Sequence, residues 1–342
     1  MVKKCLIICW FGEFPEYFPQ WVVSCSFNKS YDFLIFTDQE YSEPIPDNIK
    51  LIPLTLDEFK NKAETVLEIK CDIKKPYRIC DFRPMFGLIF KDEISDYDFW
   101  GYCDIDLIFG NLENFILDDD FAKFSAFFNG GPFTLIKNNN YMNNLFKLKG
   151  SAFNYKKVIS HDAIFAFDEV TGIQQIARNN NVNAKFLVPC IETDTRHLQL
   201  RSRFDIFNPN VQAFYWENGN LFRVAQIGKK IMYQDYAYIH LQKRKVEMLS
   251  SKNNMKESFW ITPKGFLEKN KTGQPILEDI ERFNPYNGNK MLKKEKKNYK
   301  IKKLKLILSR NPFQIYVRIK QARFHINRFD SIQLDYEWKN YM

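Results

Sequence analysis

The stretch that decides the fold reads YDFWGYCDIDLIFG, from Tyr97 to Gly110. It is an apolar, aromatic-rich run that reaches two carboxylates, Asp104 and Asp106, then turns apolar again and stops at a glycine. A run of this kind without strict alternation predicts a strand buried on both faces, as in a mostly parallel sheet. Burying two carboxylates is costly unless a cation or hydrogen bonds receive them. The pair is therefore either a site for a hard metal ion, which is our working hypothesis, or a loop that turns back to water.

The length and composition indicate a folded protein with a large core. At 342 residues the chain is long enough for one large domain or two ordinary ones. Its 33 Phe, 17 Tyr and 6 Trp predict an aromatic-rich core and exclude a mainly disordered chain. The 7 Cys form no Cys-x-x-Cys pair, which indicates reduced core residues of a cytoplasmic protein rather than disulfides or a zinc site. The sequence also shows no signal peptide and no stretch long enough to span a membrane.

The positive charge is concentrated in a C-terminal tail. Residues 290–342 hold 15 Lys and Arg against 4 Asp and Glu, whereas residues 1–289 hold 35 against 37. We therefore expect one domain over residues 1–285 and a basic helical tail over residues 286–342. One helical stripe of the tail is apolar, and it consists of Ile315, Ile319, Ala322, Ile326 and Phe329.

A basic amphipathic helix of this kind is typical of a segment that lies on an anionic membrane surface. We expect residues 290–329 to bind such a surface at the inner face of the cell membrane. Two alternatives compete with this interpretation: a tail packed on the body with its lysines in water, and an arm that binds nucleic acid. The second ranks last, and no nucleic acid is expected as a partner, because the sequence contains no recognition motif for it.

The N-terminal region predicts an α/β fold with a Rossmann-like start. Short apolar runs at 4–10, 31–38 and 49–54 read as strands, with a helical pattern near 20–25 between the first two. No Gly-x-Gly-x-x-Gly follows the first strand. A nucleotide could still lie over the carboxyl ends of the strands, where Gly12 would let the backbone approach it and Asp38 would bond a base or ribose. The alternative is that Gly12 only allows a turn and Asp38 only lies in a loop, without a ligand.

Residues 75–90 place three charged side chains around the start of a helix that should pack beneath the sheet. Pro84 is tolerated only in a first turn, so Arg78, Asp81 and Arg83 lie near the helix N-terminus. Such a helix end with nearby arginines favours phosphate. The alternative is that Asp81 caps the helix and the arginines pair with surface acids.

Three further segments complete the interpretation of the chain. Residues 118–120 are a run of Asp that we assign to a solvated loop. Residues 126–136 read as two short strands around a Gly-Gly turn, and residues 211–224 contain a hairpin with an Asn-Gly turn.

Two later segments carry candidate site residues. Asp168 and Glu169 follow a short aromatic run, and a carboxylate there could accept a proton across a cleft; the alternative is the acidic first turn of a helix that reaches Arg178. His240 ends a strand and is followed by the cations Lys243, Arg244 and Lys245. The histidine could act as a neutral metal ligand, and the cations could bind phosphate. The alternative for His240 is a satisfied core residue.

Taken together, these residues resemble the bacterial glycosyltransferases of GT-A fold found among capsule and O-antigen polysaccharide enzymes. The matching pieces are residues 75–84, residues 102–110 with the Asp-x-Asp motif, residues 167–169 and the late His240. They occur in order over roughly residues 3–245 and leave the tail outside. The resemblance implies a Rossmann-type mixed sheet flanked by helices.

The resemblance also implies a nucleotide-sugar donor, usually a UDP-sugar, and Mn²⁺ or Mg²⁺. Asp104 and Asp106 would hold the cation that bridges the diphosphate, with Asp104 also reaching the ribose. His240 would complete the metal shell, and Lys243 would steady the departing phosphate. Asp168 or Glu169 would be the base of an inverting reaction or an acceptor ligand in a retaining one. The retaining pattern His-x-x-Gly-x-x-Lys-Pro-Trp is absent, since Leu241, Gln242 and Lys243 follow His240, and the stereochemistry stays open.

We therefore expect a metal-dependent glycosyltransferase that extends a lipid-linked or oligosaccharide acceptor in the synthesis of a cell-surface polysaccharide. Two other classes compete. A metal-dependent phosphohydrolase would also use the aspartates, although such sites usually gather more carboxylate or His ligands. A non-enzymatic peripheral membrane-binding protein would carry the Asp-x-Asp motif for structural reasons alone.

Overall fold

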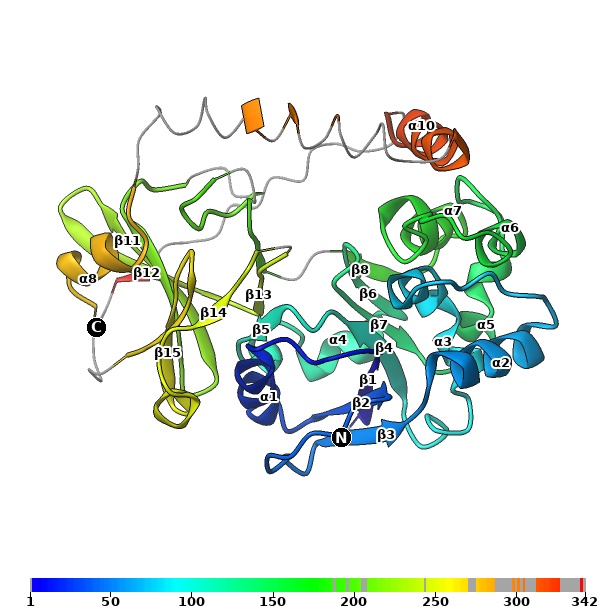
Figure 1. Ribbon diagram of the computed structural model, residues 1–342, viewed down its shortest axis with the longest axis horizontal. Helices are drawn as coiled ribbons and strands as arrows, with labels where there is room; N and C mark the ends of the chain where they lie inside the picture. The colour runs from blue at the N-terminus through cyan, green and yellow to red at the C-terminus, as the bar shows by residue number, and fades with distance from the viewer. Residues whose placement is uncertain are drawn as a thin grey trace.

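The computed structural model combines a mixed α/β body, a second, mainly antiparallel sheet and a C-terminal helix (Figure 1). The structure describes residues 2–186, 189–194, 197–203, 208–242, 244–269 and 275–286, and in the tail 297–298, 300–301, 304, 312–326 and 339–340. Within these residues no helix is both long enough and apolar enough to cross a bilayer.

The first sheet has the strand order β3-β2-β1-β4-β7-β6-β8. The four strands from β3 to β4 run parallel, β7 is antiparallel to both of its neighbours, and β6 pairs with β8 in parallel. This confirms the predicted α/β class with a mixed sheet. The strands are β1 (Lys4–Trp10), β2 (Tyr31–Thr37), β3 (Ile49–Pro53), β4 (Phe99–Cys103), β6 (Ala126–Asn129), β7 (Phe133–Lys137) and β8 (Ala184–Phe186).

Both faces of this sheet are covered, which explains the continuous apolar runs of its central strands. In β1, Cys5 and Ile7 face one core, and Leu6 and Ile8 face the other. The second core is closed by α1 (Phe18–Ser26) and α4 (Asp118–Lys123). The first core is closed by α2 (Leu56–Leu67), the 3-10 helix η1 (Pro76–Met85), α3 (Phe86–Ile89), α5 (Asn140–Asn143), α6 (Tyr155–Ile159) and α7 (Gln175–Asn179).

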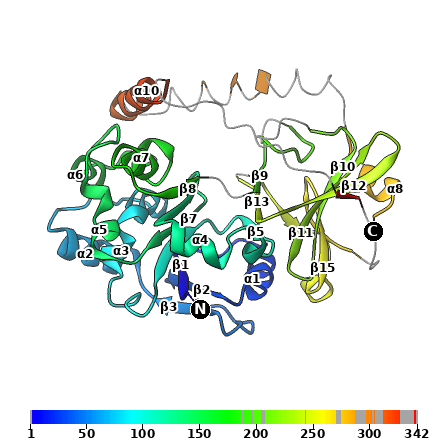
Figure 2. The same ribbon diagram turned by 180° about the vertical axis from the view of Figure 1, so that it is seen from behind.

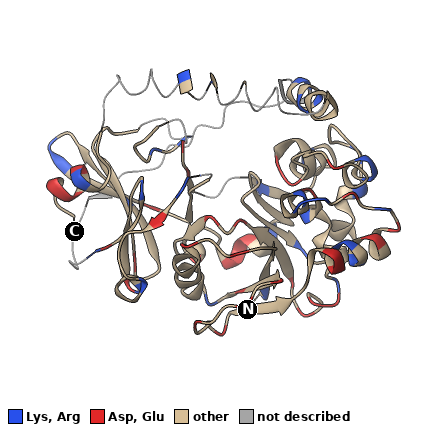
Figure 3. Cartoon of the chain, viewed as in Figure 1, with Lys and Arg blue, Asp and Glu red and all other residues tan. Residues whose placement is uncertain are grey.

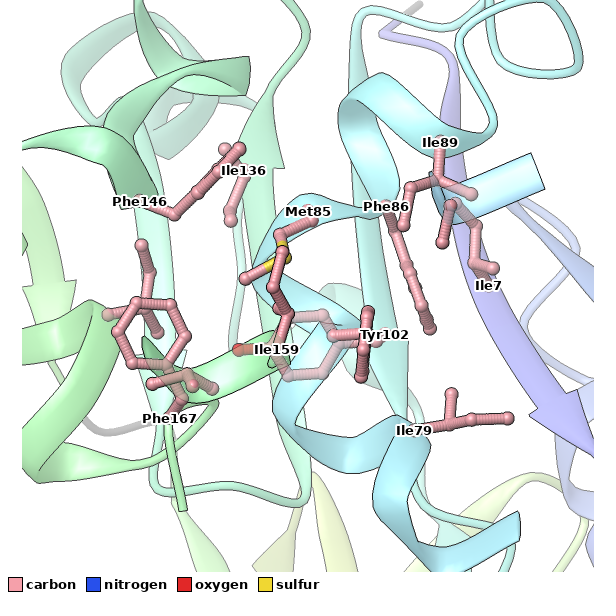
Figure 4. Packing of buried hydrophobic residues seen from close by; sticks show 14 of the residues in the cluster. Ile7, Ile79, Met85, Phe86, Ile89, Tyr102, Ile136, Phe146, Ile159 and Phe167 are labelled. Atoms are coloured by element: carbon pink, nitrogen blue, oxygen red, sulfur yellow. The ribbon is translucent and has the colours of Figure 1, made fainter. Parts of the chain in front are cut away.

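The predicted strand before the Asp-x-Asp motif is confirmed as β4, which is fully buried. Figure 4 shows Tyr102 of this strand beside Met85 and Phe86 in the first core. Pro84 lies inside η1, two residues before the α-helix begins, so it removes no hydrogen bond from an α-helix interior. The remaining short helical segments of the body are η2 (Leu112–Asn114), η3 (Leu145–Lys147), η4 (Val170–Gln174) and η5 (Lys252–Met255).

The prediction that residues 118–120 form a solvated loop is wrong. These three aspartates are the first turn of α4, and Phe121 of the same helix is buried. Carboxylates are favourable there because the helix N-terminus carries partial positive charge. The helix was not predicted because it is only six residues long and begins with a run of like charges, which is more typical of a solvated loop.

Gly101 in the middle of β4 is required by the close approach of β7. A methyl group placed on its Cα would lie 1.9 Å from the carbonyl oxygen of Thr134. We expect Gly101→Ala to lower the free energy of unfolding by about 3 kcal/mol, because the two strands must separate to admit the methyl group. Urea denaturation would measure it. The control is Gly228→Ala, which meets no atom within 4 Å and bears only the strain of its φ of +62°, about 1 kcal/mol; equal losses for the two variants would contradict the expectation.

The second sheet is a separate layer that the sequence indicated only through one hairpin. Its order is β14-β16-β15-β10-β11-β12-β17, and helix α8 (Leu277–Phe283) packs on β10. The predicted hairpin is confirmed as β10 and β11, joined by Asn218 and Gly219, which both have positive φ. The strands are β10 (Gln212–Glu217), β11 (Asn220–Ile227), β12 (Lys230–Tyr236), β14 (Glu247–Met248), β15 (Ser258–Ile261), β16 (Gly265–Glu268) and β17 (Lys339–Asn340).

A three-stranded sheet, with β13 between β5 and β9, joins the two large sheets (Figure 1). Its strands are β5 (Leu107–Phe109), β9 (Cys190–Glu192) and β13 (Tyr238–His240). The indole N–H of Trp216 in the second sheet donates to the carbonyl oxygen of Phe109 at 2.8 Å. Apart from β17, which lies in the predicted tail, the strands of both large sheets fall within the predicted domain over residues 1–285, and the two sheets are connected through β5 and β13.

The C-terminal helix α10 (Pro312–Ile326) lies against the body beside α6 and α7, as both ribbon views show (Figures 1 and 2). Val317 is fully buried, and Gln314 exchanges two hydrogen bonds with the backbone of Ile164 at 2.8 and 2.9 Å. Of the predicted apolar stripe, Ile315 is half-buried, whereas Ile319 is 48% exposed and Ala322 is also exposed. Phe329 and the side chain of Ile326 lie outside the described part of the chain.

Candidate active site

The first sheet reverses its strand order between β1 and β4, and this defines a crevice at the carboxyl ends of the strands. β1 pairs in parallel with β2 on one side and with β4 on the other. Ligands of open α/β sheets bind outside the carboxyl ends at such a switch point. Gly12 follows β1, Asp38 follows β2 and Asp104 follows β4, so the structure brings all three predicted residues to this edge.

Gly12 and Asp38 bond to each other. The Asp38 carboxylate accepts a hydrogen bond from the Gly12 N–H at 2.9 Å, which lowers the pKa of Asp38. Gly12 has a φ of +99°, in the left-handed region that favours glycine. A Cβ placed there would meet no atom within 4 Å, so the space over this backbone is open. A ligand can therefore approach the backbone at Gly12, while one oxygen of Asp38 is already occupied.

Asp104, Asp106 and His240 converge at the end of β4. The Asp-x-Asp turn runs from β4 into β5, and β5 pairs with β13 so that Leu107 lies opposite His240. The Nε2 atom of His240 lies 3.2 Å from Oδ1 of Asp106 and 3.7 Å from Oδ2 of Asp104. Among the described residues, these three side chains each offer one ligand atom within 4.8 Å of the others.

This donor set fits a divalent cation. Two carboxylate oxygens and one imidazole nitrogen suit an ion of the Mn²⁺ type, which accepts further oxygen ligands from phosphate or water. Burial lowers the pKa of His240, but Asp106 and Glu192 outweigh it and raise that pKa well above its usual value. Burial also raises the pKa of Asp106, and His240 opposes this shift. The carboxylates of Asp104, Asp106 and Glu192 thus surround His240 at a partly buried point, where a bound cation would stabilise their negative charge.

Glu192 is a site residue that sequence reasoning missed. Both of its carboxylate oxygens lie 2.9 Å from Nδ1 of His240. β9 and β13 pair in parallel with Glu192 in register with His240. The available signal was a carboxylate directly after the apolar pair Cys190 and Ile191, the same pattern that marks Asp104 after β4.

Arg83 connects the candidate metal ligands to the second acidic pair. Its guanidinium bonds Oδ1 of Asp104 with one nitrogen and lies 3.1 Å from Oδ2 of Asp168 with the other. Burial raises the pKa of Asp168 well above its usual range, although Arg83 opposes the shift. The structure therefore brings Arg83, Asp104 and Asp168 together.

Asp168 and Glu169 differ in exposure. Asp168 is 3% exposed, and its backbone oxygen accepts the Tyr102 hydroxyl at 3.1 Å. Glu169 is exposed and lies against Gly131, where an added Cβ would come within 2.8 Å of its Cγ. Both precede η4 and α7, so they stand before a helical segment, and Asp168 is also linked to Asp104 through Arg83. Glu169 is the one of the pair that solvent reaches.

One family model covers the whole of this constellation. A family model described as a family of unknown function, DUF6625, matches residues 6–270. The chain belongs to this family. No curated protein matches the sequence. The DUF6625 match includes all the candidate site residues from Gly12 to His240 and ends before α10.

Two predicted ligand-binding residues within the DUF6625 match are corrected by the structure. Arg78 is 1% exposed and Asp81 is fully buried, and the two form an ion pair. Arg78 also donates to the carbonyl oxygen of His161 at 3.1 and 3.0 Å, while Asp81 accepts the N–H groups of Phe165 and Phe167 at 2.9 and 2.7 Å. Neither can reach a phosphate, because residues 161–167 cover them. They support the segment that leads to Asp168.

The prediction for Lys243 lies outside the described residues. Its neighbour Gln242 is described and donates a side-chain hydrogen bond to Glu192. Of the residues that follow His240, Gln242 therefore contributes to the site by holding the Glu192 carboxylate with its side-chain amide.

Proposed function

We propose that this protein is a metal-dependent glycosyltransferase of GT-A type that moves a sugar from a UDP-sugar or another nucleotide sugar to an acceptor hydroxyl. The observation that carries the proposal is the convergence of Asp104, Asp106 and His240 at the carboxyl edge of the sheet. Phosphates of a nucleotide bound at a switch point lie beside that edge. A carboxylate pair alone would attract many ligands, but one placed there fits a metal-bound diphosphate.

Each side chain has a defined task in the proposed reaction. When bound, a divalent cation neutralises the charge that develops on the departing diphosphate. Asp104, Asp106 and His240 hold the ion. The open backbone at Gly12 admits the nucleotide, and Asp38 keeps that turn in its left-handed conformation through the Gly12 N–H.

The acidic pair serves the acceptor side. Asp168 is fixed by Arg83 and is the candidate for taking the proton of the attacking hydroxyl in an inverting reaction. Glu169 is exposed and is the candidate for contacting the acceptor sugar. Because Arg83 also bonds Asp104, it couples the donor side of the site to the acceptor side.

The test is a calorimetric screen of nucleotide sugars with the full chain, with and without Mn²⁺. We expect one nucleotide sugar to bind in the presence of Mn²⁺ and to bind much more weakly without it. Release of free sugar or phosphate with no acceptor product would favour a phosphohydrolase instead. Absence of binding to Mn²⁺ and to every nucleotide sugar would favour a non-enzymatic protein.

The tail would bring this activity to a membrane-held acceptor such as a lipid-linked polysaccharide at the inner face of the cell membrane. Figure 3 marks Lys and Arg positions of α10 in blue, and the exposed residues of this helix include Tyr316, Ile319, Lys320 and Arg323. Aromatic, aliphatic and basic groups on one exposed helix suit an anionic interface. Tyr316 and Lys320 also contact the Phe153 ring of the body, at 6.1 Å between ring centroids and 4.5 Å from Nζ to the centroid. Ile319 and Arg323 are exposed beside them.

We expect neutralisation of three exposed tail cations, in a Lys297→Gln, Lys300→Gln and Arg323→Gln triple variant, to weaken binding to anionic vesicles about 100-fold. Each basic residue near such a surface contributes about 1 kcal/mol, so three contribute about 3 kcal/mol. Vesicle co-sedimentation at low salt measures the change. The matched control replaces Lys29, Lys91 and Lys123, which are exposed on the body. Equal losses for the two triple variants would contradict a role for the tail.

A further inference from the structure

Glu192 lies behind His240, on the side of the imidazole that faces away from Asp104 and Asp106. Both carboxylate oxygens of Glu192 lie 2.9 Å from Nδ1 of His240, and Glu192 is only 8% exposed. The opposite ring nitrogen, Nε2, faces Asp106 at 3.2 Å and Asp104 at 3.7 Å. The imidazole is thus held between one carboxylate behind it and two in front of it.

The backbone fixes Glu192 in this place. β9 and β13 run in parallel with Glu192 and His240 in register, and the His240 carbonyl oxygen accepts the Thr193 N–H at 3.3 Å. The side-chain amide of Gln242 donates to Oε1 of Glu192. Gln242 has a φ of +56°, and the preceding Leu241 N–H donates to the Asp106 carbonyl oxygen at 3.0 Å. Glu192 therefore has partners on two sides and little freedom to rotate away.

A carboxylate on one ring nitrogen decides what the other nitrogen can do. When Glu192 accepts the Nδ1–H, the proton of the neutral ring stays on Nδ1, and the lone pair of Nε2 points at the space between Asp104 and Asp106. The same bond makes the imidazole a stronger ligand. Mg²⁺ takes mainly oxygen ligands, whereas imidazole is a ligand of transition-metal ions.

We propose that Glu192 is a positioning residue that makes Nε2 of His240 a metal ligand and so gives the centre its preference for Mn²⁺ over Mg²⁺. The inference rests on the metal assignment within the proposed function and does not depend on sugar transfer. It concerns a residue for which the sequence motif gave no role.

The experiment measures metal binding by the full chain without any nucleotide. Mn²⁺ affinity is read from the electron paramagnetic resonance signal of free Mn²⁺, and Mg²⁺ affinity from competition with Mn²⁺. Electron spin-echo modulation by ¹⁴N reports whether an imidazole nitrogen is bound to the Mn²⁺. The variants are Glu192→Gln, which keeps an acceptor for Nδ1–H without charge, and Glu192→Leu, which removes it.

Two further variants complete the design. His240→Gln gives the signal of a centre without its nitrogen ligand. Glu217→Gln is the matched control, because the Glu217 carboxylate in β10 bonds Lys269, the residue after β16, at 2.7 Å. Thermal melting of each variant shows whether it is folded.

We expect Glu192→Leu to weaken Mn²⁺ binding about 10- to 100-fold, to lose ¹⁴N modulation and to change Mg²⁺ affinity much less. The Mn²⁺ affinity and ¹⁴N modulation of Glu192→Gln should lie between those of Glu192→Leu and the natural protein. Those of Glu217→Gln should equal the values of the natural protein. If Glu192→Leu does not fold, Glu192→Gln must show the reduced modulation by itself.

The proposal would be overturned if every folded Glu192 variant showed ¹⁴N modulation as deep as that of the natural protein, even with weaker Mn²⁺ binding. Glu192 would then affect the metal through its charge alone. An equal loss of Mg²⁺ and Mn²⁺ affinity would overturn the assigned preference. If the natural protein binds Mn²⁺ with these properties but transfers no sugar, the proposed function fails and the role of Glu192 stands. If it binds no Mn²⁺, the metal assignment and the inference fail together.

Discussion

Replacing Asp106 with Asn is expected to lower the rate of metal-dependent sugar transfer about 1,000-fold or more while leaving the fold intact. The variant exchanges an anionic oxygen for a neutral amide at the point where Nε2 of His240 lies 3.2 Å away. A bound cation contributes several kcal/mol of charge stabilisation in the transition state, and each 1.4 kcal/mol or so corresponds to a factor of ten in rate. A centre that loses one of two carboxylate ligands should lose most of that stabilisation.

The structure explains why this substitution should be tolerated by the fold. The local backbone is held by the bond from the Leu241 N–H to the Asp106 carbonyl oxygen, which does not involve the side chain. Burial, and to a smaller extent repulsion from Asp104, raises the pKa of Asp106, so removing this charge relieves an unfavourable interaction.

The rate is measured with the nucleotide sugar that the calorimetric screen selects, and melting temperature is measured on the same samples. Asp119→Asn is the matched control, since Asp119 is exposed in the first turn of α4. Natural turnover in the Asp106 variant would refute the metal assignment, and an equal loss in the control would show that the effect is not specific to the site.

The sequence was sufficient to predict the site residues that lie close together in the chain or stand at the ends of strongly apolar runs. Asp104 and Asp106 follow a strand whose burial is readable from its composition, and His240 ends another. Their meeting depends on the pairing of β5 with β13, which no local pattern specifies. The same holds for Glu192, which reaches His240 through a parallel pair of strands 48 residues apart.

Charged residues that turn out to be buried were the main source of error. Arg78 and Asp81 have the spacing of groups around a helix start, and nothing local shows that residues 161–167 will cover them. Burial of an arginine becomes favourable only when distant backbone carbonyls and a carboxylate satisfy its donors. Tertiary structure, rather than the helix in which they lie, decided their role.

For the same reason we expect Asp81→Ala to lower the free energy of unfolding by about 3–5 kcal/mol, the range for breaking one partner of a buried ion pair. The variant leaves the Arg78 guanidinium 1% exposed with no counter-charge among its contacts in the structure. It also removes the acceptor for the N–H groups of Phe165 and Phe167. Unpaired buried donors add to the loss because water cannot reach them.

Chemical denaturation of the full chain gives this value, and two comparisons define its origin. Lys50→Ala breaks an ion pair with Asp32 at 3.6 Å whose side chains are 54% and 32% exposed, so it should cost at most about 1 kcal/mol. An Arg78→Met, Asp81→Leu double variant removes both charges and should recover much of the stability lost by Asp81→Ala. If Asp81→Ala lowered the free energy of unfolding as little as Lys50→Ala does, the Arg78–Asp81 pair would not be what supports residues 161–167.

The consequence for the site follows from what the pair holds in place. Residues 165 and 167 are bonded to Asp81, and Asp168 comes next with its contact to Arg83 at 3.1 Å. Under conditions where Asp81→Ala remains folded, we expect sugar transfer to fall while Mn²⁺ affinity is unchanged, because Asp104, Asp106 and His240 are held by β4, β5 and β13. Loss of Mn²⁺ binding in that variant would show that the acidic segment and the metal ligands form one cooperative unit, contrary to this assignment of roles.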